Sequence, residues 1–340
     1  MFRDNAYRLP AEWEPQSGVQ LTWPHRDTDW APMLDEVLAV YRQMAREISR
    51  REKLLVVAPE GAAPGMVHVT CPTNDTWARD HGFITLVPAD NSTEAPVRLL
   101  DFCFNGWGRK FAAELDNALN RRLYDEHRFT GEYEDHLDFV LEGGSIESDG
   151  RGTIMTTSSC LLAPNRNQPM KKSDIERELK RRLCADRVLW IDHGHLEGDD
   201  TDGHIDTLVR MAPDDTLLYV ATDDTTDAHY DDLMKMRRQI ESFLTADGKP
   251  YRLLPLPLPH PIVDTDGTRL PATYANFLVV NGAVLCPTYA QEELDNEALK
   301  TIGRAFPGRE TVPIDCRNII RQHGSLHCCT MQFPLNTLRS

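Results

Sequence analysis

Residues 32–59, PMLDEVLAVYRQMAREISRREKLLVVAP, place a helical pattern directly before a short apolar run. Apolar side chains recur at helical spacing in the first part, which predicts an amphipathic helix over residues 32–52. The predicted buried face carries Leu34, Val37, Leu38, Tyr41, Met44 and Ile48. Residues 54–59 are strongly apolar, as a short buried strand is. A helix that leads into a buried strand is typical of an α/β fold.

The same pattern returns at wide and fairly regular intervals. Five helices are expected in all, and the later four begin near Phe111, Ser173, Asp227 and Glu292. A strand-like run follows each helix, at residues 54–59, 137–141, 188–192, 251–254 and 311–315. A turn or polar motif and a paired strand pattern come next, and one such pair turns through Asn281-Gly282, a strong hairpin signal. The interval of roughly sixty residues indicates one supersecondary unit used five times.

The last unit lacks a partner strand, and residues 18–23, GVQLTW, would supply it and close a ring. An ordinary α/β sheet would give much the same pattern. The ring is favoured because a reactive residue follows the inner strand at the same point in four of the units, so these residues would converge near one axis. Since no linker or composition shift divides the chain, we expect one domain over residues 1–340.

Bulk composition excludes several classes of protein. The chain is 41% hydrophobic and 26% charged, as is ordinary for a globular protein. Its net charge of −16 argues against nucleic-acid binding and is compatible with a cationic substrate, although solubility would also explain it. No apolar run is long enough to cross a membrane, and residues 1–6 lack the apolar core of a secretory signal. The eight cysteines include no CxxC pair, so we expect reduced thiols and a cytoplasmic location.

Two adjacent cysteines, Cys328 and Cys329, stand near the end of the chain. On a strand they would point to opposite faces, so only one can face a pocket. A bare cysteine pair is more often two small buried hydrophobes. His327 would diverge from Cys328 for the same geometric reason, which makes His204 the better partner. In Gly203-His204-Ile205-Asp206, positions 204 and 206 would share one face of a strand.

Each of the other polar motifs also has a purely structural explanation. A metal pair at His204 and Asp206, with further aspartates upstream at 199, 200 and 202, is disfavoured because no third nitrogen or sulfur ligand lies at a convincing spacing. Trp77-Ala78-Arg79-Asp80 offers an aromatic wall and a charge, yet a core tryptophan beside a turn aspartate fits equally well. Glu142-Gly143-Gly144 is compatible with an ordinary turn. Together, however, a cysteine, a histidine and three acidic residues are the groups needed to attack the central carbon of a guanidinium cation.

In its motifs and their order the chain resembles the agmatine deiminases and the bacterial peptidyl-arginine deiminases of the guanidino-group-modifying superfamily. Besides the motifs above, the resemblance includes Phe104-Asn105-Gly106-Trp107-Gly108, Cys160-Leu161-Leu162-Ala163-Pro164-Asn165-Arg166-Asn167, Asn276-Phe277, Asn281-Gly282-Ala283-Val284, and His327-Cys328 with Thr330 and Gln332. It runs nearly from end to end. The resemblance implies a five-bladed, pseudo-symmetric α/β propeller of ββαβ units.

The resemblance also implies the role of each site residue. Cys328 matches the nucleophile, and His204 matches the general acid and base. The carboxylates that bind the guanidinium are Asp80 and Asp206, and Glu142 lines the same site. Trp77 and Trp107 resemble the aromatic residues beside the substrate chain, and Cys329 replaces an aliphatic residue, as a buried inert thiol would.

The implied activity is hydrolysis of agmatine to N-carbamoylputrescine and ammonia through a cysteine thiouronium intermediate, with no metal or organic cofactor. The partner is a small cationic guanidino compound, and members of the family are often dimers or tetramers. Neither nucleic acid nor a membrane is expected as a partner.

The chain departs from the family pattern beside the expected pocket. Arg321-Gln322-His323-Gly324-Ser325 replaces a glycine run with an asparagine, and Arg109 stands where a second glycine is common. These changes leave open the group beyond the guanidinium: free arginine, with Arg109 or Arg321 as a basic partner, or peptidyl arginine. A catalytically silent propeller that only binds, and a cysteine peptidase, are the alternatives from other classes.

Overall fold

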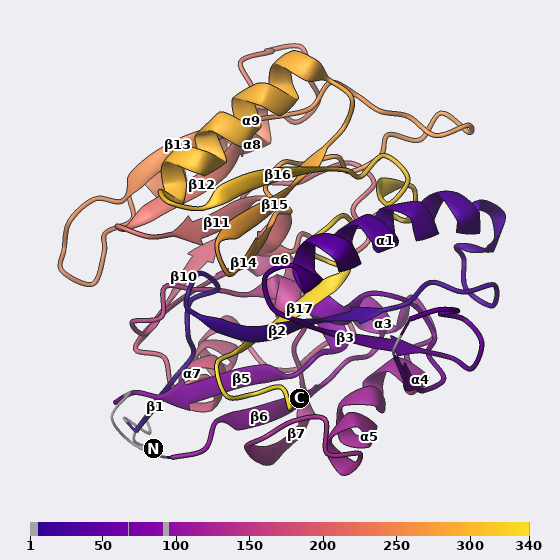
Figure 1. Cartoon of the computed structure of the whole chain (residues 1–340). Helices are drawn as coiled ribbons and strands as arrows, with labels where there is room; N and C mark the ends of the chain where they lie inside the picture. Colours follow the sequence, from indigo (N-terminus) through magenta and orange to yellow (C-terminus); the bar gives the residue numbers. More distant parts are fainter. Residues whose placement is uncertain (1–5, 67, 91–94, 340) are drawn as a thin grey trace.

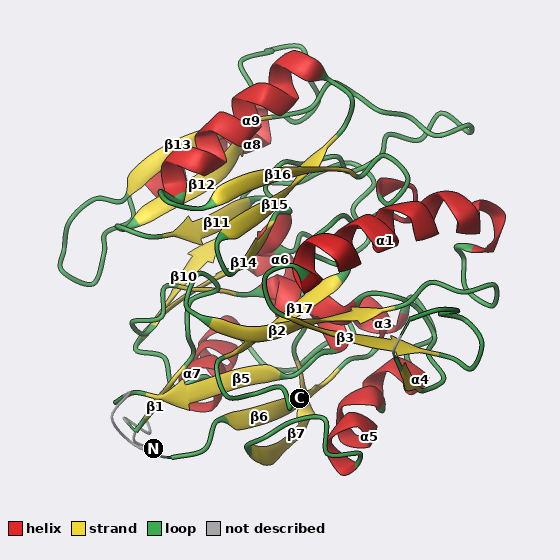
Figure 2. Cartoon of the chain, viewed as in Figure 1, coloured by secondary structure: helices red, strands yellow, loops and turns green. Residues whose placement is uncertain are grey.

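The structure, a computed structural model, describes residues 6–66, 68–90 and 95–339 (Figure 1). The sequence interpretation of residues 1–6 as lacking a secretory signal therefore falls almost wholly outside the described residues. Within them, the fold is mixed α/β, and its strands form five small sheets instead of one continuous sheet. Figure 2 shows the longer helices at the outside of the molecule, with the strands between them.

The first two sheets contain, in strand order, β1 (Tyr7–Arg8), β5 (Ile84–Pro88), β6 (Arg98–Cys103) and β7 (Glu132–Val140), then β10 (Arg187–Ile191), β9 (Thr153–Thr157) and β8 (Glu147–Ser148). The next two contain β11 (Val209–Ala212), β12 (Thr216–Ala221) and β13 (Arg252–Pro257), then β14 (Leu278–Val280), β15 (Ala283–Thr288) and β16 (Glu310–Asp315). The fifth contains β17 (Thr330–Pro334), β2 (Gln16–Thr22), β3 (Lys53–Ala58) and β4 (Val69–Thr70).

The longer helices are α1 (Leu34–Ser49), α5 (Leu119–Asp125), α7 (Lys172–Arg182), α8 (Tyr230–Glu241) and α9 (Glu292–Ala305). Short α-helical turns are α2 (Ala78–His81), α3 (Gly106–Arg109), α4 (Glu114–Asn117) and α6 (Ser158–Leu161). The 3-10 turns are η1 (Ala31–Met33), η2 (Gly143–Ser145), η3 (Ile205–Thr207) and η4 (Ile320–Gln322).

All five sheets share one internal order. A central strand pairs antiparallel with one neighbour and parallel with the other, as β12 does with β11 and β13. The same holds around β6, β9, β15 and β2. Helical segments connect the two parallel strands in each case, because parallel neighbours need a long crossover. The predicted repeat of strand, strand, helix and strand is therefore present five times in the described residues.

The fifth sheet joins the two ends of the chain. Strand β17 pairs antiparallel with β2, with Thr330 opposite Leu21 and Phe333 opposite Gly18. The predicted pairing of residues 18–23 with the final unit is confirmed. Because the turn that carries Cys328 leads directly into β17, this pairing also anchors the C-terminal motif to the N-terminal part of the chain.

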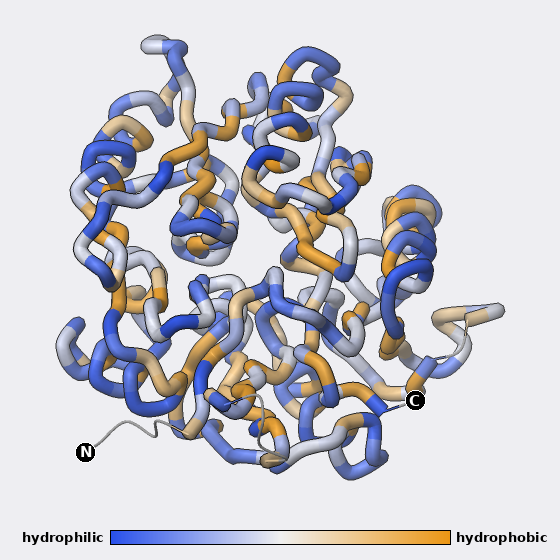
Figure 3. Tube along the Cα trace, turned by 60° about the vertical axis from the view of Figure 1, so that its left-hand side comes forward, coloured by the Kyte–Doolittle hydropathy of each residue, from blue (hydrophilic) through white to orange (hydrophobic). Residues whose placement is uncertain are grey.

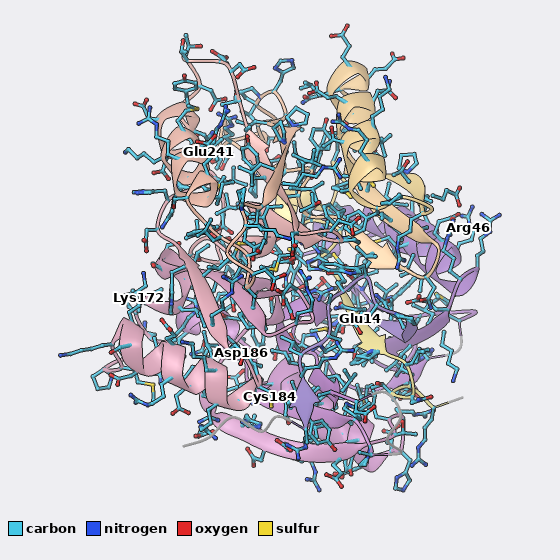
Figure 4. All side chains as sticks on the ribbon, turned by 90° about the vertical axis from the view of Figure 1, so that its left-hand side faces the viewer. Glu14, Arg46, Lys172, Cys184, Asp186 and Glu241 are labelled. Atoms are coloured by element: carbon cyan, nitrogen blue, oxygen red, sulfur yellow. The ribbon has the colours of Figure 1, made fainter. Side chains whose placement is uncertain are left out.

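Helix α1 follows the predicted pattern closely. Its buried residues include Val37, Tyr41, Met44 and Ile48, while Leu34 and Leu38 on the same predicted face are only partly buried. Asp35 and Glu36 lie in its first turn, where acidic side chains interact favourably with the helix dipole. Exposed charged residues such as Arg46 of α1 and Glu241 of α8 lie at the periphery in Figure 4.

Two local expectations are wrong. The helix predicted near Phe111 is divided into the three short helices α3, α4 and α5. The strand predicted at residues 251–254 extends further, because Pro255 and Pro257 lie in β13. This strand is at the edge of its sheet, where a proline without an N–H can be accommodated.

Large apolar clusters fill much of the interior. The largest hydrophobic cluster includes strands β11, β12, β14 and β15, and its centre contains Leu218, Phe277 and Leu285, all fully buried. Figure 3 shows hydrophobic residues along the inner segments and hydrophilic residues on the outer helices. No helix in the described part of the chain combines the length and apolar content required to cross a membrane.

Leu285→Ala should lower the free energy of unfolding by about 2–5 kcal/mol, because the fully buried Leu285 packs at the centre of β15 and the change leaves a cavity. Chemical denaturation followed by tryptophan fluorescence measures this. Leu244→Ala is the matched control, since Leu244 is 50% exposed, and should cost less than about 1 kcal/mol. Equal losses in the two variants would contradict the assignment of the core.

Candidate active site

The five predicted reactive residues come together from different parts of the chain. Asp80 lies in α2, and Glu142 directly precedes η2. His204 precedes η3, which contains Asp206, and Cys328 lies in the turn before β17. All five side chains are buried. Segments that are far apart in the sequence thus converge on one small region, as the motif analysis predicts.

Gly144 lies where three of these side chains meet. A Cβ atom on Gly144 would lie 2.6 Å from His204 Nδ1, 2.9 Å from Asp80 Oδ1 and 3.2 Å from Asp206 Oδ2. On Gly143 it would lie 2.2 Å from a backbone carbonyl oxygen. Neither glycine has a positive φ. The Gly-Gly pair is therefore required by close packing and not by an unusual turn conformation.

The strand geometry expected around the reactive residues is wrong at both places. His204 and Asp206 belong to a tight 3-10 turn, and Cys328 and Cys329 lie in a turn before the strand begins. Gly203, with a φ of 89°, reverses the chain just before His204. His204 and Asp206 still reach the same region, because the turn directs both side chains at Gly144.

The aspartates upstream of His204 organise its loop. Asp199 accepts hydrogen bonds from the backbone N–H of Gly203 (2.6 Å) and the hydroxyl of Thr201 (2.6 Å). Asp202 accepts from Arg166 Nη1 (2.6 Å) and Lys110 Nζ (2.8 Å). Their oxygens are therefore already used to hold the loop, which removes the sequence argument for a metal at these positions.

Asp80 is held by two neutral donors. Trp107 Nε1 donates to Asp80 Oδ2 and the backbone N–H of Gly144 donates to Oδ1, both at 3.0 Å. Burial raises the pKa of Asp80 to about 6; His204 opposes the rise, and the charges of Asp206 and Glu142 reinforce it. Trp107, expected beside the substrate chain, thus also orients this carboxylate.

Asp206 has a histidine as its partner instead. His327 Nδ1 contacts Asp206 Oδ2 at 2.7 Å, while Oδ1 has no hydrogen-bond partner among the described residues. Burial would raise the pKa of Asp206, but His327, His204 and Arg210 outweigh it and hold this pKa below its usual value. The site therefore combines a carboxylate that stays ionised with one that titrates near pH 6.

His204 lies between two carboxylates. Its Nδ1 is 3.7 Å from Asp80 Oδ1, and its Nε2 is 3.7 Å from Glu142 Oε2. Burial would lower the pKa of His204, but Asp80, the Cys160 thiol and Glu142 outweigh burial and raise it well above the usual value. The protonated ring is favoured, so His204 is poised to donate a proton.

Glu142 is paired with an arginine that the sequence analysis assigned no role. Arg166 Nε donates to both Glu142 oxygens, at 3.1 and 3.2 Å, and the Arg166 side chain is fully buried. Burial would raise the pKa of Glu142, but His204 and Arg166 hold it below its usual value. Glu142, Cys160 and His204 present ligand atoms within 4.8 Å of one another. Because the Arg166 cation occupies the Glu142 oxygens, a metal ion at this point would be repelled.

Cys328 lies beside the second carboxylate. Its Sγ is 3.4 Å from Asn276 Oδ1 and 3.9 Å from Asp206 Oδ2. Burial, and then the charges of Asp206 and Asp80, raise the pKa of Cys328 well above its usual value. The thiol form is therefore favoured until a cation approaches. Burial raises the pKa of the fully buried Cys329 to about 12, in keeping with an inert thiol.

A pocket of about 160 Å³ opens onto Cys328 and Asp80. The rings of Trp77 and Trp107 form part of its wall and meet edge to face, with centroids 6.4 Å apart. The other lining residues are Asp29, Asp75, Phe111, Asp200, Thr201, Gln322, His323 and Gly324. Among the described residues, no lysine or arginine lines this pocket. The space is therefore aromatic at its walls and acidic in charge.

The sequence analysis missed three residues that shape the site. Asn276 contacts Cys328, and its signal was its place in Tyr274-Ala275-Asn276, at the motif point of the fourth unit. Asp75 accepts from the indoles of Trp30 (3.1 Å) and Trp77 (2.9 Å), and nothing in its spacing indicated this. Arg166 lies in the motif of residues 160–167, which the sequence analysis used only as part of the family resemblance and to which it assigned no role.

Residues 8–334 match the family of Porphyromonas-type peptidyl-arginine deiminases. The chain belongs to this family. An agmatine deiminase from Medicago truncatula is 33% identical to it, with 97% of each chain covered. Among solved structures, an agmatine deiminase from C. jejuni with substrate bound is 36% identical, with a TM-score of 0.89 and 98% and 97% of the two chains covered. A candidate arginine deiminase from Porphyromonas gingivalis is 48% identical, with a TM-score of 0.91 and 98% and 100% covered.

The family's fold extends to more distant enzymes. An amidinotransferase from Microseira wollei shares 14% sequence identity with this chain, at a TM-score of 0.59 over 98% of this chain and 99% of the other. At this identity the likeness concerns the fold alone. This deiminase family member therefore shares its mixed α/β fold with that amidinotransferase.

Asp80→Asn should make Cys328 react about three- to tenfold faster with iodoacetamide at about pH 8, because a nearby negative charge that disfavours the thiolate is removed. Mass spectrometry of the peptide, with fragment ions that separate Cys328 from Cys329, measures the rate. Asp27→Asn is the control, since the Asp27 side chain is 82% exposed. An unchanged or slower rate in Asp80→Asn would contradict the electrostatic account.

Proposed function

We propose that this protein is an agmatine deiminase, which hydrolyses agmatine to N-carbamoylputrescine and ammonia. The observation that carries the proposal is the pocket over Cys328, which is lined by carboxylates and, among the described residues, by no lysine or arginine. Such a pocket suits a substrate with a cation at each end. Relatives named as agmatine deiminases, similar over nearly the whole chain, support the same activity.

In the first step, the guanidinium binds between Asp80 and Asp206. Asp206 Oδ1, which has no hydrogen-bond partner among the described residues, is available to accept from the substrate. The arriving cation favours ionisation of Asp80, whose pKa is about 6 before the substrate binds. Paired charge-assisted hydrogen bonds then fix the plane of the cation and direct its central carbon at Cys328. Trp77 and Trp107 pack beside the carbon chain of the substrate.

Cys328 is the nucleophile in this proposal. The bound cation lowers the pKa of its thiol, whose proton passes to solvent. The sulfur then bonds to the central carbon, and the electron pair of a C–N double bond moves to nitrogen, which gives a tetrahedral intermediate. His204 donates its proton to the departing nitrogen, and ammonia leaves. An S-alkylthiouronium on Cys328 remains, while Glu142, held by Arg166, orients His204.

Water completes the reaction. His204, neutral after the first half, takes a proton from water as the oxygen bonds to the thiouronium carbon. The carbon–sulfur bond then breaks, the electron pair returns to sulfur as thiolate, the remaining hydroxyl proton passes to solvent, and the ureido product is released. Each proton transfer is assigned to His204 or to solvent, so the proposed mechanism needs no metal or organic cofactor.

The acidic lining favours agmatine over arginine. Free arginine would bring a carboxylate, for which Arg109 and Arg321 were the expected partners. Arg321 Nη2 instead lies 3.5 Å from Asp264 Oδ1, and neither arginine lines the pocket. Asp75 and Asp200 are left to face a distal ammonium. Arginine, favoured by the name of the 48% identical relative, is the second candidate, and peptidyl arginine is the third.

We further propose that the five sheets stand as blades around one axis, as a five-bladed α/β propeller, and that residues 1–340 form one catalytic domain. The shared strand order and the pairing of β17 with β2 support this arrangement. The proposal also includes a cytoplasmic location, a possible homo-oligomer, and neither nucleic acid nor a membrane as partner. The net charge of −16 supports the exclusion of nucleic acid.

Proteins of two other classes fit the site less well. A cysteine peptidase needs donors for an oxyanion, and Asp80 and Asp206 beside Cys328 would repel one. Burying charged groups is costly, and a catalytically silent binding protein would not need a protonated His204 buried among three carboxylates. The arrangement therefore favours catalysis on a cation.

Wild-type protein should release ammonia and a ureido product from agmatine, with a kcat/KM at least about a hundredfold above that for arginine or a blocked arginyl peptide, because the pocket offers carboxylates to the distal group. Cys328→Ala should lower the rate by roughly a thousandfold or more. Cys329→Ala is the matched control and should retain activity. Turnover of arginine in preference to agmatine would contradict the substrate assignment.

The acid limb of the kcat/KM profile should lie near pH 6, because Asp80 must be ionised to bind the guanidinium and its pKa is about 6. Activity is therefore lost as pH falls through this value. Trp107→Phe should move the limb to higher pH, since the indole N–H that stabilises the Asp80 carboxylate is removed. A profile that stays flat down to about pH 5 would contradict this role of Asp80.

A further inference from the structure

His327, next to the nucleophile, lies between two carboxylates, one from the N-terminal segment and one from the middle of the chain. Its Nδ1 is 2.7 Å from Asp206 Oδ2, and its Nε2 is 2.8 Å from Glu12 Oε2. All three side chains are at least 90% buried. Glu12 belongs to the segment before β2, a part of the sequence to which the motif analysis assigned no function.

Both contacts require a proton on the imidazole. A carboxylate oxygen only accepts hydrogen bonds, so a ring nitrogen at 2.7 or 2.8 Å must carry the hydrogen. Burial would raise the pKa of Glu12, but His327 and Arg210 outweigh it and hold that pKa well below its usual value, so Glu12 is ionised. His327 with a proton on both nitrogens satisfies both carboxylates at once.

Further charged groups surround these three side chains. Arg210 Nη2 donates to Glu12 Oε2 (2.7 Å) and also lies 3.2 Å from His327 Nε2, while Arg210 Nε donates to Glu147 (2.7 Å). The backbone N–H of Val279 donates to Glu12 Oε1 at 2.7 Å. Arg79 Nε lies 3.5 Å from the His327 carbonyl oxygen, and Glu52 and Arg309 are further charged groups that interact with Glu12.

We propose that Glu12 is a positioning residue for guanidinium binding: through His327 it keeps Asp206 ionised and turned so that Asp206 Oδ1 faces the substrate. The pairing uses Oδ2 and leaves Oδ1 without a partner among the described residues. Asp80 accepts hydrogen bonds only from neutral donors, and its charged neighbour His204 lies farther away, at 3.7 Å. Asp206 is thus ionised before the substrate binds, whereas ionisation of Asp80 is completed when the substrate binds.

This inference rests on the proposed function and is tested by binding instead of turnover. In a Cys328→Ser background, which removes the thiol, calorimetry with agmatine gives the dissociation constant across pH. Glu12→Gln keeps the shape of the side chain and removes its charge. Glu14→Gln is the matched control from the same segment, because Glu14 pairs with Arg8 and has no contact with His327.

Glu12→Gln should weaken agmatine binding about tenfold at neutral pH, since a charge-assisted hydrogen bond that orients Asp206 is lost. The acid limb of binding should also become steeper, because Asp206 joins Asp80 in taking up a proton. Glu12→Asp should restore part of the affinity, and Glu14→Gln should match the background. An equal loss at every pH, or no loss, would overturn the proposal, since a purely structural role would not change the slope.

Nitrogen NMR of labelled histidines gives a readout independent of agmatine. The signals of His327, assigned by their absence in His327→Gln, should show two protonated ring nitrogens in the Cys328→Ser protein and one fewer in Glu12→Gln. A neutral His327 in the background protein would overturn the proposal. If the background protein bound no agmatine at all, the proposed function would fail, and these signals would still decide whether Glu12 holds the imidazolium.

Discussion

Three carboxylates buried beside one another are the constraint on which the rest of this structure depends. Asp80, Asp206 and Glu142 repel one another, and burial deprives each of water. The chain compensates each one differently. Glu142 has Arg166 and Asp206 has His327, whereas Asp80 accepts from two neutral N–H donors and has the His204 ring 3.7 Å away. Asp80, the least compensated carboxylate, has a pKa of about 6, so a bound cation would supply the positive charge that stabilises its ionised form.

This arrangement explains much of the surrounding architecture. Arg166 reaches Glu142, Asp202 and the carbonyl of Thr201, so it joins the pocket to the loop that carries His204. Gly144 allows the backbone to approach close enough to donate to Asp80. On the far side, Arg210 and Glu12 support His327 from behind. Few groups are proposed to contact a guanidinium. The side chains that hold those groups in place are buried behind them.

Strand pairing fixes the positions of these groups relative to one another. Because β17 pairs with β2, the turn with His327 and Cys328 is fixed against the segment that carries Glu12. Hydrogen bonds from the backbone N–H groups of His327 (2.9 Å) and Cys328 (3.3 Å) to Asn276 Oδ1 tie the same turn to the fourth unit. A turn held from two sides can present a thiol to a buried pocket without belonging to a strand.

The sequence by itself predicted the repeating unit and a set of candidate reactive residues, because helical and strand periodicity and residue chemistry are local properties. It also predicted that residues 18–23 pair with the end of the chain. It could not show that residues 204–206 and 327–329 form turns, since a histidine and a carboxylate two positions apart suit a strand or a 3-10 turn alike. Tertiary structure alone decided the partners: Arg166 for Glu142, Trp107 for Asp80, and His327 with Glu12 for Asp206. Charge compensation in a buried site depends on distances between segments that are 24 to 315 residues apart in the sequence, and no local pattern encodes those distances.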